Sequence, residues 1–290
     1  MKFITIIGVG LIGSSIARKI RAIDEKIQIN IIDNSKENLE KSKLLQLGNI
    51  FSLNIDKQIE NSDIIFLCTP ISTYEKILHK LNNFELSNTI ISDVGSSKVK
   101  VVKLAESILE NKIFVPGHPI AGTEKSGPEN GLEYLFKDKW FISTNCNLCS
   151  EKNLEYINSL WRKLGSKTIT MKSKDHDSIM AITSHIPHLI AYNIVGTASE
   201  LGENIKSEVI KFSASGFRDF TRIASSDPIM WRDIMLSNKE EIISLFEKFN
   251  DDLKQILDAI KKDDGEFLVR KFKKTREIRE KIIEAGFDKN

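Results

Sequence analysis

The first seventeen residues, MKFITIIGVGLIGSSIA (1–17), determine how the rest of the chain is interpreted. The β-branched run KFITII predicts a buried strand. Gly8-x-Gly10-x-x-Gly13 follows it and precedes a helical pattern, LIGSSIARKIRAI. Glycines at this spacing permit a tight turn, close approach of a pyrophosphate to the backbone, and close packing of the helix on the strand. The stretch superficially resembles a signal peptide, but a strand and a glycine turn fit it better.

Asp33 lies twenty residues after Gly13, at the end of the second predicted strand, KIQINIID. A carboxylate there accepts hydrogen bonds from an adenosine ribose, so the combination predicts a dinucleotide site. The site favours NAD over NADP, because Asp33 would repel a 2′-phosphate and no arginine follows it directly. A purely structural glycine turn is the less favoured alternative. The predicted cofactor-binding residues are Gly8, Gly10, Leu11, Ile12, Gly13, Asp33, Thr69 and Pro70.

Strand and helix patterns alternate through the first part of the chain, as in KFITIIGVG, SDIIFLCTP, NTIISDVG and KIFVPG. This alternation predicts an α/β domain with a Rossmann-type, doubly wound, mostly parallel sheet over residues 1–172. From about Ser173 onward only helical patterns follow: a long run broken near Pro187, a second long helix starting in a capping box at Ser237, and a last charged helix. We therefore expect an all-α domain over 173–290, whose amphipathic helices favour a homodimer.

Composition excludes several classes of protein. The 290 residues carry 42 Lys and Arg against 40 Asp and Glu, interspersed, so the basic footprint of a nucleic-acid-binding protein is missing. No apolar run approaches membrane-spanning length. Three cysteines give no disulfide framework, which favours the cytoplasm. Cys146 and Cys149 form a C-x-x-C that lacks the context of a zinc or thioredoxin-like site, and we expect no metal.

A second informative stretch is GHPIAGTEKSG (117–127), which follows the apolar run KIFVP. It places His118 and Glu124 six positions apart in a predicted glycine-bounded loop. Histidine is the side chain best suited to move a proton near neutral pH, and loops set by rigid strands often carry catalytic groups. A tight turn whose histidine only caps a neighbour is the alternative.

The remaining histidines differ in context. His79 lies in an ordinary amphipathic helix and is predicted to be at the surface. His185 and His188 are about one turn apart across Pro187, so they can share a helix face. No H-E-x-x-H pattern accompanies them, so a polar lining of a substrate cleft is favoured over a metal site, with buried structural histidines as the alternative.

Two further motifs carry polar groups. Ser96 follows the strand TIISDVG, where it could orient the imidazole, the nicotinamide or the substrate, or serve as a helix N-cap. Arg218 and Arg222 are four apart in GFRDFTR. A guanidinium grips a carboxylate with two hydrogen bonds, so Arg222 is either a substrate clamp or a simple ion-pair partner of Asp219 or Asp227.

Taken together, the chain resembles the prephenate/arogenate dehydrogenase family over nearly its whole length. The resemblance rests on five motifs in the family's order: GVGLIGSSIA, DVGSSK, GHPIAGTEKSG, HDSIMAITSHIPH and GFRDFTRIASSDPIMW. It implies a nicotinamide-binding domain, a helical dimerisation domain, and an active site in the cleft between them.

The resemblance also implies roles for individual residues. His118 matches the catalytic histidine that faces the ring hydroxyl of the substrate, and Ser96 matches the serine that supports it. Arg222 matches the arginine that binds substrate carboxylate, and Glu124 matches an acidic residue at the pocket rim. His185 and His188 match the family's histidine pair, of which His188 is favoured as substrate-facing. Position 218 departs from the pattern, because Arg218 stands where lysine is common.

The activity that this resemblance implies is NAD-dependent oxidative decarboxylation of prephenate. Arogenate as the substrate is the first alternative. A β-hydroxyacid dehydrogenase would need a catalytic lysine that the stretch from Asp175 to His188 lacks. A non-catalytic NAD-binding protein is disfavoured by His118, Ser96 and Arg222.

Overall fold

The computed structural model describes residues 1–200, 211 and 214–284. The chain forms two compact units, Met1–Ile242 and Ile243–Asn290, which are described separately below. Of the predicted segments, Leu201 at the end of the long helical run and Ser213 before the arginine motif lie outside the described residues.

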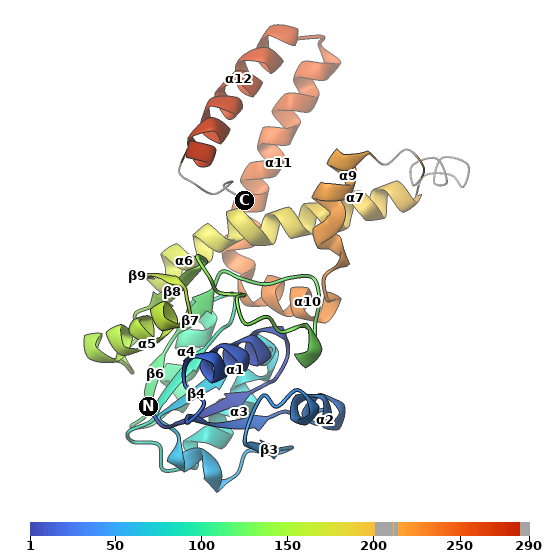
Figure 1. Ribbon diagram of the computed structural model, residues 1–290. Helices are drawn as coiled ribbons and strands as arrows, with labels where there is room; N and C mark the ends of the chain where they lie inside the picture. The colour runs from blue at the N-terminus through green and yellow to red at the C-terminus, as the bar shows by residue number, and fades with distance from the viewer. Residues whose placement is uncertain (201–210, 212–213, 285–290) are drawn as a thin grey trace. The chain divides into compact units, whose positions relative to one another are not determined.

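The first unit is built on a six-stranded sheet in the order β3-β2-β1-β4-β5-β6 (Figure 1). All of its neighbouring strands are parallel. The strands are β1 (Phe3–Ile7), β2 (Gln28–Ile32), β3 (Ile50–Ser52), β4 (Ile64–Leu67), β5 (Ile90–Asp93) and β6 (Ile113–Val115). This order confirms the predicted doubly wound fold, in which ligands bind beyond the carboxyl ends of the strands where the strand order reverses, here between β1 and β4.

Helices cover both faces of this sheet, as a parallel sheet requires. Ile4 and Ile6 of β1 belong to a buried cluster on one face with Trp161, whereas Ile7 packs with Tyr74 on the other face. The helices are α1 (Leu11–Ile23), α2 (Lys36–Leu44), α3 (Tyr74–Asn82), α4 (Val99–Ile108) and α5 (Glu151–Lys163), with short 3₁₀ helices at Lys57–Asn61, Ile71–Thr73 and Pro128–Asn130.

A second, three-stranded sheet contains β7 (Gly117–Pro119), β8 (Trp140–Thr144) and β9 (Lys167–Met171). The prediction that His118 lies in a loop is wrong in this respect, because His118 pairs with Ile142 in an antiparallel ladder between β7 and β8. Gly117 permits this pairing, since a Cβ there would lie 2.4 Å from the Phe141 ring. Backbone hydrogen bonding therefore holds His118 more rigidly than a loop would.

The helical part of the first unit follows β9. It consists of α6 (Ser173–Met180), a π-helical turn (Ala181–His185), α7 (Ile186–Glu200), α9 (Ser215–Thr221), a 3₁₀ turn (Arg222–Ser225) and α10 (Pro228–Ser237). The predicted break near Pro187 is displaced. The π turn precedes the proline, which lies in the first turn of α7, where a missing N–H is tolerated.

The last two helices are α11 (Lys239–Lys261), which runs from the first unit into the second, and α12 (Gly265–Ile282). The predicted capping box at Ser237 is wrong: Ser237 ends α10, and its hydroxyl lies 2.6 Å from that of Ser97. Asp264 caps α12 by accepting a hydrogen bond from the Phe267 amide. None of the described helices is long and apolar enough to cross a membrane.

Candidate functional site

The glycine turn after β1 has the geometry that a dinucleotide needs. Gly8 has φ +93°, and a Cβ on Gly13 would lie 2.1 Å from the Gly8 carbonyl oxygen, so neither position accepts a larger residue. A Cβ on Gly10 would meet no described atom within 4 Å, so the backbone there is open to a ligand. Gly10 precedes α1, whose first turn from Leu11 contains no acidic residue and no side-chain cap. The amide groups at this helix end are therefore available to a phosphate.

Asp33 turns back toward the glycine motif. Its carboxylate accepts hydrogen bonds from the amides of Val9 at 2.8 Å and Ser35 at 2.8 Å. The Asn38 side-chain amide also donates to Oδ1, at 3.4 Å, so these bonds fix the orientation of the carboxylate, and Oδ2 keeps a lone pair for a ribose hydroxyl. Thr69, at the end of the neighbouring β4, approaches Gly8, since its methyl lies 2.7 Å from the position of a Gly8 Cβ. This edge of the sheet fits the adenosine and pyrophosphate of NAD.

His118 meets a histidine that the sequence did not single out as a site residue. Its Nδ1 lies 2.8 Å from Nε2 of His176, and the Nδ1 of His176 lies 2.8 Å from the Asp177 carboxylate. His176 and Asp177 are almost completely buried, and His118 is half-buried. Burial, followed by the charge of His176, holds the pKa of His118 well below its usual range. His118 is therefore neutral near pH 7, the state that a base requires.

Asp177 also anchors the first turn of α4. Its two oxygens accept hydrogen bonds from the amides of Lys98 at 2.7 Å and Val99 at 2.8 Å. A carboxylate at a helix N-terminus satisfies unpaired amides and complements the helix dipole. The helical segment that carries His176 is thereby attached to the sheet that carries the glycine turn.

Lys98 and Asp93 form a buried ion pair beneath His118. Nζ of Lys98 lies 2.5 Å from the Asp93 carboxylate and donates a hydrogen bond to the Gly117 carbonyl at 2.7 Å. Asp93 in turn accepts a bond from the Gly117 amide at 3.0 Å. Burial lowers the pKa of Lys98, and the Asp93 charge opposes that effect. The ion pair thus fixes the amide and the carbonyl of Gly117, the residue before His118.

His185 is fully buried and has a defined tautomer. The Asn238 side-chain amide donates to the Asp177 carbonyl at 2.8 Å, which identifies its nitrogen, and the same nitrogen lies 3.1 Å from Nδ1 of His185. Nδ1 is therefore an acceptor, and the proton of the neutral ring is on Nε2. No side chain of the described residues bonds to that Nε2, and the Ser96 backbone is the group that interacts with the ring by a hydrogen bond. Burial, the largest cause, lowers the pKa of His185 to about 4.

His188, one turn further along α7, stacks on Trp231 with ring centroids 3.6 Å apart. Its Nδ1 lies 2.9 Å from the Ser184 carbonyl, so Nδ1 donates and Nε2 is left as an acceptor. Burial lowers the pKa of His188 and the charge of Arg222 lowers it further, whereas the Ser184 hydrogen bond raises it. Trp231 thus fixes the plane of this imidazole.

Arg222 and Glu124 form an exposed ion pair at 3.4 Å. The sequence offered Asp219 or Asp227 as ion-pair partners in the alternative to a substrate clamp, whereas the structure connects Arg222 to the stretch that contains His118. Within the part of the chain that is described, no side-chain partner is found for Arg218 or for Ser96, although Ser96 is half-buried. Of the predicted substrate residues, the structure therefore brings together Arg222, Glu124 and His188, and it leaves Arg218 in solvent.

Several residues of this network escaped prediction: Asp93, Lys98, His176, Asp177 and Asn238. A signal for three of them was present, because Asp93 ends a buried apolar strand and His176 and Asp177 lie at the start of the helical region. Nothing in the local pattern indicated that Lys98 would be buried. Its ion-pair partner Asp93 is only five residues earlier, but its other contacts, with the Gly117 carbonyl and the Asp177 carboxylate, come from parts of the chain that are remote in the sequence.

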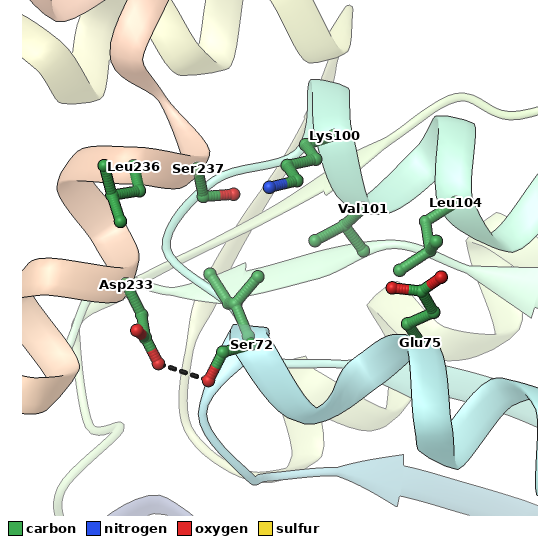
Figure 2. Close-up of a pocket in the computed structure, with 9 residues that line it drawn as sticks. Ser72, Glu75, Lys100, Val101, Leu104, Asp233, Leu236 and Ser237 are labelled. Atoms are coloured by element: carbon green, nitrogen blue, oxygen red, sulfur yellow. Dashed lines mark hydrogen bonds between the residues drawn. The ribbon is translucent and has the colours of Figure 1, made fainter.

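Figure 2 shows a separate hollow between α3, α4 and α10, in which the Ser72 hydroxyl donates to Asp233. Its volume of about 180 Å³ is below the roughly 300–1,000 Å³ of typical small-molecule pockets. None of the predicted site residues lines it. The lining residues are Ile71, Ser72, Glu75, Lys100, Val101, Leu104, Asp233, Leu236 and Ser237.

Comparison with known families accounts for most of the chain. The family profile described as "Prephenate dehydrogenase, nucleotide-binding domain" matches residues 16–170, and "Prephenate dehydrogenase, dimerization domain" matches residues 172–274. Among curated proteins, a cyclohexadienyl dehydrogenase of Zymomonas mobilis is 35% identical over 278 residues, which is 96% of this chain and 95% of the relative. A prephenate dehydrogenase of Bacillus subtilis is 33% identical over 279 residues, covering 96% of this chain and 75% of that protein.

Solved structures point to the same family as the sequence comparisons. A prephenate dehydrogenase of Aquifex aeolicus, in complex with hydroxyphenyl propionate and NAD+, superimposes with a TM-score of 0.91 at 35% identity, covering 97% of this chain and 98% of that one. An arogenate dehydrogenase of Synechocystis gives a TM-score of 0.79 at 26% identity, with 97% and 99% covered. With the dinucleotide turn, the buried histidine network and these matches in hand, the chain belongs to the prephenate dehydrogenase family.

Proposed function

We propose that the protein catalyses NAD-dependent oxidative decarboxylation of prephenate to 4-hydroxyphenylpyruvate, CO2 and NADH, a step of tyrosine biosynthesis. The observation that carries the proposal is a neutral His118 held on a strand of the same unit that carries the glycine turn and Asp33. Membership of the family extends this argument over both parts of the chain.

The residues divide the chemistry between them. Bound NAD+ supplies the hydride acceptor. His118 takes the proton of the substrate's ring hydroxyl, a role for which a neutral imidazole with a free ring nitrogen is suited. Loss of CO2 then makes the ring aromatic. The departing carboxylate must give up its charge, so a strong clamp on it would stabilise the ground state and slow the reaction.

For that reason we assign Arg222 to the pyruvyl-side carboxylate. Glu124 keeps the guanidinium oriented by the 3.4 Å ion pair until the substrate arrives. His188 lies within the electrostatic influence of Arg222 and is assigned to the same substrate. We assign the Nε2–H of His185, which bonds to no side chain of the described residues, as a further donor to a substrate oxygen. Ser96 and Arg218 have no competing side-chain partner among the described residues. We assign the Ser96 hydroxyl to the nicotinamide side of the site and Arg218 to the substrate as a second cation.

A second candidate substrate is arogenate, which carries an ammonium group in place of the keto group. Two observations favour it as the alternative. Glu124 places a carboxylate beside the arginine that we assign to the side chain of the substrate. In addition, relatives named cyclohexadienyl dehydrogenase and arogenate dehydrogenase are similar over nearly the whole chain.

We also propose the predicted division into an NAD-binding domain, 1–172, and a helical domain, 173–290, with a cytoplasmic homodimer as the working form. The second compact unit supports dimerisation, because Leu257, Ile260, Val269 and Phe272 are about half exposed. An apolar surface of this kind is typical of a protein interface. The name of the family profile that matches residues 172–274 points the same way.

The test is NADH formation by purified protein with prephenate or arogenate, each with NAD and NADP. We expect turnover with prephenate and NAD. Preference for arogenate would select the second candidate, and absence of turnover with both substrates would refute the dehydrogenase function. Sedimentation of the wild type and of Phe272→Asp tests the dimer, with Lys274→Asp as the control, since position 274 lies about 200° around the helix from Phe272.

A further inference from the structure

The side chains of Asp177, His176 and His118 form one hydrogen-bonded row. Only one direction of hydrogen-bond donation along this row is possible. The distances are 2.8 Å from the Asp177 carboxylate to Nδ1 of His176 and 2.8 Å from Nε2 of His176 to Nδ1 of His118. We propose that Asp177, acting through His176, sets the tautomer of His118 so that its Nε2 is the basic nitrogen. His176 and Asp177 are thus positioning residues for the proton transfer.

The direction begins at Asp177. Its Oδ1 accepts from the Lys98 amide at 2.7 Å and its Oδ2 from the Val99 amide at 2.8 Å, bonds that only an acceptor can make. Two donated amide bonds at a helix N-terminus are the arrangement that a carboxylate acceptor satisfies. The bond from His176 to the same Oδ1 is therefore donated by the imidazole, which places the His176 proton on Nδ1.

The imidazole of His176 transmits this choice. A neutral ring with its proton on Nδ1 has only a lone pair on Nε2. His118 must then donate from its own Nδ1, which leaves the lone pair of His118 on Nε2. No described residue is hydrogen-bonded to that Nε2, so it remains available to a substrate hydroxyl. Without Asp177, either tautomer of His176 would be allowed. In the tautomer with the proton on its Nε2, His176 would donate to Nδ1 of His118, and His118 would then carry its own proton on Nε2.

Burial enforces neutrality along the row. His176 is 0% exposed, and burial, as the largest cause, lowers its pKa, although the Asp177 hydrogen bond opposes the shift. The titratable groups that act on His118 are His176, Lys98 and His185. Those that act on His176 are Asp177, Lys98 and Asp93. When His118 takes a proton, its new positive charge is connected through two hydrogen bonds to the Asp177 carboxylate. The negative charge of that carboxylate stabilises the protonated ring.

A purely structural role would be that Asp177 caps α4 and His176 fills the core. That role accounts for the two amide bonds but requires no histidine at position 176. The row also crosses between elements remote in sequence, β7 and α6, at the residue that we assign as the base. The inference rests on the proposed function only for its catalytic consequence, since the tautomer can be measured without substrate.

The first measurement is long-range proton–nitrogen NMR of protein labelled with ¹⁵N-histidine at pH 8, with the His118 signals identified by their absence in His118→Asn. We expect His118 to be protonated on Nδ1 and unprotonated on Nε2. In His176→Leu, which lacks the acceptor, we expect a mixture of tautomers. A wild-type His118 protonated on Nε2 would overturn the proposal, whatever the activity of the enzyme.

The second measurement compares His176→Leu, His176→Gln and, as the control, His79→Leu on the exposed face of α3. A glutamine oxygen can replace Nε2 of His176 as the acceptor from His118. We expect kcat to fall at least about tenfold in the leucine variant, as for other orienting hydrogen-bond partners, and to recover in the glutamine variant. NAD affinity should be unchanged in both. Equal kcat in the leucine and glutamine variants, with both folded and binding NAD, would refute the positioning role.

Discussion

Lys98 and Asp93 are both fully buried and lie 2.5 Å apart, with Lys98 also bonded to the Gly117 carbonyl. The pair connects the end of β5 to the start of β7, and so connects the parallel sheet to the short strand that carries His118. A buried ion pair is sensitive to the loss of one member, because the other charge is then left without compensation.

Lys98→Met should therefore lower the free energy of unfolding by about 3–5 kcal/mol. Lys100→Met, an exposed neighbour, should change it by less than about 0.5 kcal/mol. Urea unfolding of the two variants provides the measurement. If the second substitution Asp93→Asn restores none of the loss in the Lys98→Met background, the destabilisation does not come from an uncompensated charge.

The surroundings of this ion pair show where sequence reasoning stops, because Gly117 and Asp177, which both bond to Lys98, lie 19 and 79 positions after it. The glycine turn, Asp33 and the alternation of strands with helices could be predicted, because each depends on local periodicity or on a short motif. His118 was identified, but its partner was not, since His176 follows it by 58 positions and is brought close only by the pairing of β7 with β8 and β9. The same holds for Arg222, whose partner Glu124 lies 98 positions away.

His118→Asn should reduce kcat by about 10²–10⁴-fold, the usual contribution of a general base. NAD affinity should be retained, because the glycine turn and Asp33 make no hydrogen bond to His118. Steady-state kinetics with prephenate and calorimetric titration with NAD measure the two effects, with His79→Asn as the control. Turnover near the wild-type level would remove His118 from the mechanism.

Arg222→Ala should raise KM for prephenate far more than it lowers kcat, because a clamp on the pyruvyl-side carboxylate acts equally in the ground state and the transition state. Glu124→Gln removes the 3.4 Å ion pair while keeping the shape of the side chain. This variant therefore reports the effect of a disoriented guanidinium, whereas Arg222→Ala reports the effect of its loss. Initial rates over a range of prephenate concentrations give both constants. A collapse of kcat at unchanged KM would mean that Arg222 acts on the reacting centre.

Acid should destabilise the fold through its buried histidines. The folded pKa of His185, about 4, lies below the ordinary value of 6.5, so the unfolded chain binds the proton more readily. The stability that His185 contributes is present above pH 6.5 and is lost as the pH falls toward 4, by about 3 kcal/mol in total. The lowered pKa values of His118 and His176 act in the same direction.

His185→Gln should therefore weaken the dependence of unfolding free energy on pH in this window, whereas the exposed His79→Gln should leave it unchanged. Urea unfolding midpoints at several pH values between 4.5 and 7.5 provide the comparison. Parallel pH profiles for His185→Gln and the wild type would show that His185 does not titrate with a depressed pKa.

The thiols of Cys146 and Cys149 lie 3.4 Å apart, and the single Cys146 proton is shared between Cys149 and the Phe114 carbonyl, which lies 3.0 Å away. The hydrogen bond between the two thiols lowers the pKa of Cys149 to about 7 and raises that of Cys146, while burial raises the pKa of Cys68. Because the thiolate is the nucleophile, iodoacetamide at pH 8 should modify Cys149 first. Cys146→Ser weakens the donor and should slow that modification, whereas Cys68→Ser should leave its rate unchanged. Peptide mass spectrometry over a time course resolves the sites, and equal labelling of all three cysteines would contradict the assignment.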